Sequence, residues 1–387
     1  MGAAMGTVTA PPSEPQNIGR AYTKRQRWAL ELRYFVPFIG IISYCLLGLH
    51  QASALLAKAT TSNFYLQVAL CWIPVWIICT AASLLVSCYS FYLDRKFGLV
   101  KSDLRTWLRD SLKANTLALV LGGMVMEIAF ASNTLSPVHG WIWAGILCSI
   151  LFLGVAGLLP WLLSLFYPMK PLSNDSLRER LTRLATRAGI QVGRISEWHV
   201  SGRTRKANAL VAGVGRARRI LLTDTLISEL SEDEVEAMVG HELGHCVYHH
   251  IRTRVLLQNV IYCGIFWVID AAVRNGLVWF ADDSVDWTDL RLLPGIFLFW
   301  AIGHLQGTLL LAALARRQEK AADLYGWSLI GRVEPFITAI KKLTDLNLIV
   351  YDKTSQWRYL HPATTERIAA AQQYAKAHGE VIGGNEA

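Results

Sequence analysis

The chain has 387 residues, of which 53% are hydrophobic and only 17% are charged, and its formal net charge at pH 7 is +9. Its mean hydropathy is positive, at +0.31. This composition excludes an ordinary soluble domain and is typical of a protein embedded in a membrane.

The first segment, residues 1–27, is expected to be a flexible tail. Its first 20 residues are rich in Pro, Gly, Ala and Thr, have no apolar core and precede a basic cluster. These features differ from those of a cleaved signal peptide. We therefore expect the first membrane-spanning helix itself to direct insertion.

Six stretches are apolar and long enough to cross a bilayer as helices, which requires about 20 residues each. Four belong to an N-terminal membrane domain at 28–167, and two form a membrane hairpin at 255–315. The third is the weakest, because it is short and carries Glu127. The expected spans are 34–57, 64–93, 112–131, 141–167, 255–281 and 292–315.

Lysine and arginine are distributed unevenly between these spans. They precede the first span, fill the loop after the second, and follow the fourth and the sixth, whereas the loop "ADDSVDWTD" is acidic. Because short basic loops stay in the cytoplasm, both termini are predicted to be cytoplasmic. We expect an integral multi-pass protein of a plasma or inner membrane. The asymmetry accounts for the net charge, and no nucleic-acid partner is expected.

The seven cysteines are scattered, and most lie inside or beside spans without paired spacing. Buried thiols are the expected state. Neither cysteine-bound zinc nor a disulfide is expected in a cytoplasmic domain.

Outside the spans, the sequence predicts a soluble domain in two parts, 168–254 and 316–387. In the first, "PLSNDSLRERLTRLATRAGI" has leucines at helical spacing, whereas "ISEWHV" and "NALVAGVGRARRILLT" are rich in strand-forming residues, with Gly213 and Gly215 at a hairpin turn. Ser231 followed by Glu234 predicts a capping box at the start of a further helix. The second part is predicted to be mostly helical, with a disordered C-terminal end.

The helix after Ser231 carries "HELGH" and continues toward the fifth span. His241 and His245 are four residues apart, so they share one helix face and can both reach one zinc ion. Glu242 follows His241 directly and therefore points in a different direction around the helix axis. This position suits Glu242 to activate a metal-bound water better than to bind the metal itself. The alternative interpretation is a solvated, polar helix end.

The third ligand is less evident. Three histidines along a straight helix span more than ~10 Å by rise alone, so His249 cannot join His241 and His245 on one ion. His249 and His250 are expected at the membrane surface instead. The stretch "ARRQEKAADLYG" after the sixth span supplies Glu319 and Asp323 on one helix face. Two neighbouring antiparallel helices would bring both motifs together.

HELGH and the later Glu319–Asp323 motif occur together with further motifs in a fixed order along the chain. In this order of motifs, the sequence resembles the integral-membrane zinc metalloproteases that include the type-one CaaX prenyl proteases and the HtpX heat-shock proteases. The resemblance runs from about residue 92 to 370. It covers "YLDRKFGLVKSDLRTWLRDSLK", "KANALVAGVGRARRILLTDTLI", "HELGH", "EKAAD" and "HPATTERI".

The resemblance implies one zinc ion per chain, bound by His241, His245 and Glu319. Glu242 would be the general base, and Asp323 would orient a ligating histidine. The implied fold is a mostly α membrane protein of about six transmembrane helices with a cytoplasmic gluzincin-type protease domain and a small β-sheet.

Two further residues are implied to face the substrate. His361 is a candidate donor to the tetrahedral oxyanion, the alternative being a surface histidine at a helix start. Asn208 lies in an extended run that could pair with a peptide as an added strand, and its alternative is an ordinary turn or edge residue.

Prenyl proteases have seven spans around a chamber, whereas six are counted here. HtpX proteases have fewer spans and lack the loop beginning at Tyr92, so the chain is nearer the prenyl-protease branch.

Ionisable residues also lie inside the spans: Glu127, His304 and the pair Asp270 with Arg274. They indicate either a water-filled cavity leading to zinc or, as the preferred interpretation, pairing in the interior of the helix bundle.

The predicted function is zinc metalloendopeptidase activity on membrane-associated or unfolded proteins. Its partners would be a peptide or protein substrate and the lipid bilayer, and the oligomeric state is not indicated. CaaX-type tail processing and a non-catalytic membrane scaffold are the alternatives. A transporter would explain the intramembrane charges but leaves both zinc motifs unexplained.

Overall fold

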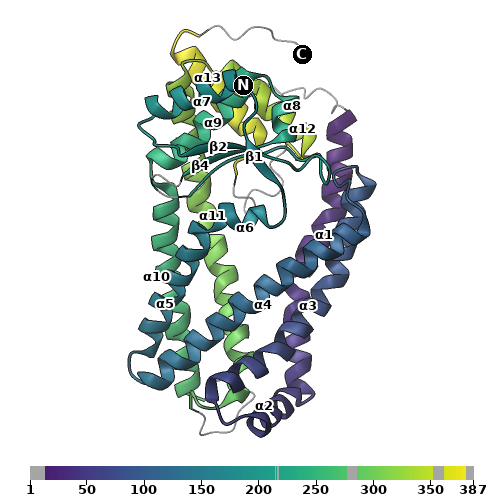
Figure 1. Ribbon diagram of the computed structural model, residues 1–387, viewed down its shortest axis with the longest axis vertical. Coiled ribbons are helices and arrows are strands. Elements are labelled where there is room, and N and C mark those ends of the chain that lie inside the picture. Colours follow the sequence, from purple (N-terminus) through teal and green to yellow (C-terminus); the bar gives the residue numbers. More distant parts are fainter. Residues whose placement is uncertain (1–13, 214, 216–217, 277–285, 352–360, 381–387) are drawn as a thin grey trace, which may run out of the picture.

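The computed structural model describes residues 14–213, 215, 218–276, 286–351 and 361–380. A small sheet and several short helices form one end of the molecule, and long helices extend away from it (Figure 1). The predicted class, a mostly α membrane protein with a small sheet, is confirmed.

The long helices supply five to six candidate membrane spans, in agreement with the predicted six. Among the described residues, five helices are long and apolar enough to cross a membrane, and Phe35–Leu46 with Leu49–Thr60, bent by 71°, is a sixth candidate if the pair is one span. The long helices are α1 (Glu14–Leu46), α3 (Phe64–Lys96), α4 (Leu104–Leu135), α5 (Gly140–Gly157), α10 (His250–Arg274) and α11 (Leu293–Ile330).

Two expected boundaries were wrong, and one expected span is bent within its length. The segment 14–27 is helical rather than a flexible tail, because α1 begins at Glu14; residues 1–13 lie outside the described part. The first span is broken at Gly48, whose left-handed φ of 69° separates α1 from α2 (Leu49–Thr60). The fourth span ends at Gly157 and is followed by the short helix α6 (Leu159–Ser164).

In Figure 1, α1 runs beside α3, while α5, α10 and α11 run together on the other side, with α4 crossing obliquely between them. A common apolar core joins these helices. Within it, Trp72 of α3 lies against Gly122 of α4, where an added Cβ would meet its ring at 2.4 Å. Its indole also donates a hydrogen bond to the Leu119 carbonyl at 2.9 Å.

The charged residues of the fifth span form an ion pair, in which Asp270 is buried and Arg274 is exposed. Arg274 Nε donates to Asp270 Oδ2 at 2.7 Å, and Trp287 Nε1 donates to Asp270 Oδ1 at 3.0 Å. The His304 ring stacks on the ring of Trp300, with centroids 5.2 Å apart, and lies nearly parallel to the ring of Tyr262, at 6.3 Å. All seven cysteines, which lie within the described residues, are free thiols.

The sheet contains four short strands in the order β1-β2-β4-β3. The strands β2 and β4 are parallel, and the other two neighbouring pairs are antiparallel. The predicted hairpin joins β3 to β4, and its turn begins at Gly213, whose φ is 94°. The strands are β1 (Met169–Pro171), β2 (Arg194–Trp198), β3 (Ala209–Ala212) and β4 (Arg219–Thr223).

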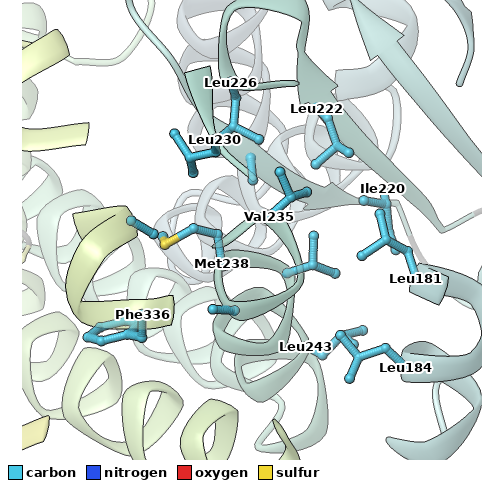
Figure 2. Packing of buried hydrophobic residues seen from close by; sticks show 14 of the residues in the cluster. Leu181, Leu184, Ile220, Leu222, Leu226, Leu230, Val235, Met238, Leu243 and Phe336 are labelled. Carbon is cyan, nitrogen blue, oxygen red and sulfur yellow. The ribbon is translucent and has the colours of Figure 1, made fainter. Parts of the chain in front are cut away.

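Helix α9 (Glu232–Val247) is the centre of the second apolar core. The predicted capping box is present, since Glu234 N donates to Ser231 Oγ and Ser231 N donates to Glu234 Oε2. Figure 2 shows Val235, Met238 and Leu243 of α9 packed among residues of neighbouring elements. The neighbours include α7 (Asp175–Arg187), β4 and α12 (Glu334–Leu346); α8 (Asp224–Glu229) and α13 (Thr364–Ala377) complete the domain.

The loop between α3 and α4 is held against the domain that contains the sheet. Lys101 N donates to the Arg203 carbonyl at 2.8 Å, and Val100 forms an isolated β-bridge with Thr204. Arg203 also forms an ion pair with Asp110 of α4. This loop, predicted from the motif that begins at Tyr92, therefore joins the membrane helices to the domain that carries HELGH.

Candidate active site

Small residues bring α9 and α11 close together. A Cβ added at Gly326 of α11 would lie 2.9 Å from the backbone nitrogen of His241, and one added at Gly240 would lie 2.9 Å from Ile330 Cδ1. Glycine at these positions lets the two helix backbones approach until side chains of both meet in one small volume. The glycine inside HELGH, Gly244, makes the same kind of contact with Ala322.

At this crossing, the structure brings together the two histidines of HELGH and the glutamate of EKAAD. His241 Nε2 lies 3.2 Å from His245 Nε2 and 3.4 Å from Glu319 Oε2, and His245 Nε2 lies 3.3 Å from Glu319 Oε1. One ligand atom from each residue lies within 4.8 Å of the other two. Glu319 and His241 are almost fully buried, with 2% and 3% of their surfaces exposed.

Asp323, one turn after Glu319, lies on the other side of the His241 ring. Its Oδ1 is 2.7 Å from His241 Nδ1. Burial alone would lower the pKa of His241, but the charge and hydrogen bond of Asp323 outweigh it and raise the pKa to about 9. Asp323 is thus placed to fix the ring orientation, with Nε2 directed at Glu319.

The sequence argument missed Arg367 of α13. Its Nε donates to Asp323 Oδ2 at 2.8 Å, and it also forms an ion pair with Asp323 Oδ1. Both side chains are buried, so each charge compensates the other. A signal for Arg367 was present in the sequence, because Arg367 is the arginine of the motif "HPATTERI", but that motif alone did not indicate its partner.

The expected position of His250 was wrong. Helix α9 ends at Val247, and a break at His249, whose φ is 54°, separates it from α10. Because of this break, His250 is buried and its Nδ1 lies 2.9 Å from His245 Nδ1. His249 itself is exposed.

Two further groups lie beside Glu319. His361 Nδ1 is 2.6 Å from Glu319 Oε2, although 63% of the His361 side chain is exposed. Arg254 Nη2 is 3.7 Å from Glu319 Oε1, and Arg254 is joined to Gln318 by a hydrogen bond from its Nε. His361 therefore lies at the open side of the cluster.

The remaining predicted residues are Glu242 and Asn208. Glu242 is half-buried next to His241 on α9. Asn208 is exposed directly before the edge strand β3, and its backbone pairs with Thr223 of β4. Strand β3 packs on α9, but the Asn208 side chain has no contact with the His241–His245–Glu319 cluster among those recorded for the described residues.

The donor chemistry of the cluster fits a zinc ion. Two imidazole nitrogens and a carboxylate are the three protein ligands of many catalytic zinc sites, which keep a fourth position for water or substrate. The Nε2 atoms of His241 and His245 lie 3.2 Å apart, so a cation between them and Glu319 would satisfy three acceptors at once, two of them on buried residues.

The chain matches two protein-family models. Residues 171–375 match peptidase family M48, and residues 19–167 match the CAAX prenyl protease N-terminal domain, described as having five membrane helices.

Individual relatives agree with these matches. The chain is 27% identical to CAAX prenyl protease 1 of Saccharomyces cerevisiae, over 83% of this chain and 76% of that protein. It is 30% identical to the uncharacterized metalloprotease YhfN of Bacillus subtilis, over 55% of this chain and 50% of that protein.

Its fold also resembles the crystal structure of S. mikatae Ste24p, with a TM-score of 0.82, 23% identity and coverage of 94% of this chain and 92% of that one. The family model for M48 covers more than half of the chain and includes both motifs that meet at the cluster. The chain therefore belongs to peptidase family M48 and is a membrane zinc metalloprotease similar to the CAAX prenyl proteases.

Proposed function

We propose that this chain is an endopeptidase that uses one zinc ion, held by His241, His245 and Glu319. The observation that carries the proposal is the convergence of these three donors within 4.8 Å at the crossing of α9 and α11. When bound, zinc polarises the scissile carbonyl and increases the acidity of the attacking water.

The residues around the cluster have separate roles in this proposal. Glu242 takes a proton from the attacking water and returns it to the leaving amine. Asp323 holds the Nδ1–H of His241, so that Nε2 faces the metal. Arg367 compensates the buried charge of Asp323 and keeps it ionised.

Substrate contacts are assigned to His361 and Asn208. The contact of His361 with Glu319 uses Nδ1, so we assign its Nε2 to the developing oxyanion of the substrate. Asn208 precedes β3, which is the edge of the sheet and packs on α9. A peptide added to this edge would be recognised mainly through its backbone.

We propose that the substrates are extended segments of membrane-associated or unfolded proteins at the cytoplasmic face of a plasma or inner membrane. Recognition through backbone groups tolerates many side chains, so access to the membrane surface would select the substrate. The assignment of the cytoplasmic side rests on the basic loops of the sequence.

A second candidate is the removal of the tail of a prenylated CaaX protein. It is favoured by the match of residues 19–167 to the CAAX prenyl protease N-terminal domain, and by a relative of that name that aligns over 83% of the chain. This candidate needs the same zinc cluster and base but restricts cleavage to sites beside a lipidated cysteine.

Protein termini in membranes that contain either the wild-type enzyme or Glu242→Gln distinguish the candidates. New termini at many extended juxtamembrane sites, absent with Glu242→Gln, are expected for the broad endopeptidase. Termini confined to sites next to a lipidated C-terminal cysteine would replace it with the CaaX candidate. If no terminus depends on Glu242, the chain is a non-catalytic scaffold.

A further inference from the structure

The break between α9 and α10 gives His250 a position that a continuous helix could not provide. In a straight helix, a residue five positions after His245 lies about 140° away around the axis, facing elsewhere. The structure instead ends α9 at Val247 and places His249 in the left-handed region, with φ of 54°. A non-glycine residue rarely adopts this conformation. The turn brings the ring of His250 back to His245.

The contact between the two rings is close and buried. His250 has 7% of its surface exposed, and its Nδ1 lies 2.9 Å from His245 Nδ1. The ring centroids are 5.0 Å apart, with an interplanar angle of 71°. His245 therefore has its Nε2 at the cluster of His241 and Glu319 and its Nδ1 on His250.

This geometry restricts the protons on both rings. If His245 binds a metal through Nε2, that nitrogen has no proton, so its Nδ1 carries the proton and must donate. The acceptor 2.9 Å away is His250 Nδ1, which must then be unprotonated. His250 is consequently neutral, with its own proton on Nε2.

We propose that His250 is a positioning residue that accepts the Nδ1–H of His245 and fixes the tautomer and ring orientation in which His245 binds zinc. The inference rests on the proposed zinc site. It makes the two histidine ligands unequal: a carboxylate, Asp323, holds His241, whereas an uncharged imidazole holds His245. The second arrangement orients the ligand without adding another negative charge to the cluster.

Zinc affinity of the purified full-length protein, measured by competition with a chromophoric chelator, tests this role. His250→Leu removes the acceptor at similar volume, and we expect zinc to bind about 10- to 100-fold more weakly, as for other lost partners of metal ligands. His250→Asn keeps an oxygen acceptor near the position of Nδ1 and should remain within a few fold of wild type. His249→Asn, which changes the exposed neighbour but tolerates the left-handed conformation, should bind zinc normally.

A packing role would give a different result. Equal loss of zinc affinity in His250→Leu and His250→Asn, or no loss in either, would overturn the proposal. The melting temperature in excess chelator gives a second readout: both variants should melt close to metal-free wild type if His250 acts through zinc. If His250→Leu does not fold, His250→Gln, whose amide oxygen reaches beyond the Nδ1 position, should bind zinc more weakly than His250→Asn.

The zinc site itself has a separate control. If the proposed site is wrong, wild-type protein binds no stoichiometric zinc, or His245→Ala binds it as well as wild type. If the site is right and only the role of His250 is wrong, wild type binds one zinc, His245→Ala loses it, and His250→Leu retains wild-type affinity.

Discussion

Gly244 of α9 lies so close to Ala322 of α11 that an added Cβ would stand 2.9 Å from the Ala322 Cα and 3.0 Å from its carbonyl oxygen. Both neighbouring atoms belong to the backbone, so they cannot move aside without shifting a helix. The glycine between the two histidines of HELGH is therefore a packing requirement, and it sets the distance between the two helices that carry the proposed ligands.

Gly244→Ala should push α9 away from α11 and weaken zinc binding together with stability. Overpacking of a close contact typically costs about 1–3 kcal/mol of unfolding free energy. The measurement is zinc content and melting temperature of the purified variant. Gly264→Ala on α10 is the control, since its Cβ would meet nothing within 4 Å. Equal zinc content and stability in both variants would refute this account of the crossing.

Removal of Glu319 should empty the zinc site. Glu319→Ala deletes the ligand from α11 and leaves both histidines on α9, so zinc should fall from about one ion per chain to near zero. A chelator should lower the melting temperature of wild type, because bound zinc stabilises the folded state, but not that of Glu319→Ala. Equal zinc loading of the two proteins would remove Glu319 from the site.

Glu234 predicts a pH dependence of stability outside the zinc site. Burial would raise its pKa, but Lys342, at 2.8 Å, and the Ser231 N–H outweigh this and lower it. A carboxyl whose folded pKa is lowered stabilises the fold above its unfolded pKa, about 4.3, and loses that contribution as pH falls through the folded value.

Glu234→Gln should therefore lower the unfolding free energy by about 1 kcal/mol at pH 7. The difference from wild type should shrink below about pH 4.3. Denaturant titrations at several pH values measure it, with Glu334→Gln, an exposed glutamate of α12, as the control. A difference that stays constant from pH 7 to pH 3 would contradict the role of the Glu234 charge.

Membrane orientation gives a prediction from the basic loops alone. Reporters fused after residue 200 and after residue 375 should both lie in the cytoplasm, and a reporter near Asp283, outside the described residues, should lie on the opposite side. Protease protection or a reporter active on one side only would show the location. A reporter after residue 200 on the side opposite the cytoplasm would overturn the orientation.

Much of the architecture could be predicted from the sequence because its signals are local. The apolar spans, the capping box of Ser231 and Glu234, and the hairpin at Gly213 depend on residues close together in the chain, and the structure contains all three. The convergence of His241 and His245 with Glu319 was also expected, because each motif follows helical spacing and the two helices were expected to be antiparallel neighbours.

The features that sequence reasoning missed depend on tertiary contacts. The position of His250 follows from a left-handed residue, His249, that is not glycine, so no local signal marks the break. Arg367 reaches Asp323 across 44 positions of the chain, and helical periodicity carries no information at that range. The bend at Gly48 is different, because its signal is local: a glycine within an apolar stretch marks the end of a helix.

The most direct test of the central claim is peptide cleavage by purified, zinc-loaded wild type and Glu242→Gln, with zinc measured in the same samples. Both proteins should hold about one zinc per chain, while the variant should cleave an extended peptide about 10²- to 10⁴-fold more slowly, as expected when a general base is lost. Glu229→Gln, which changes an exposed glutamate on α8, should retain wild-type rates. Undiminished cleavage by zinc-loaded Glu242→Gln would contradict the claim that this cluster and its adjacent base hydrolyse peptides.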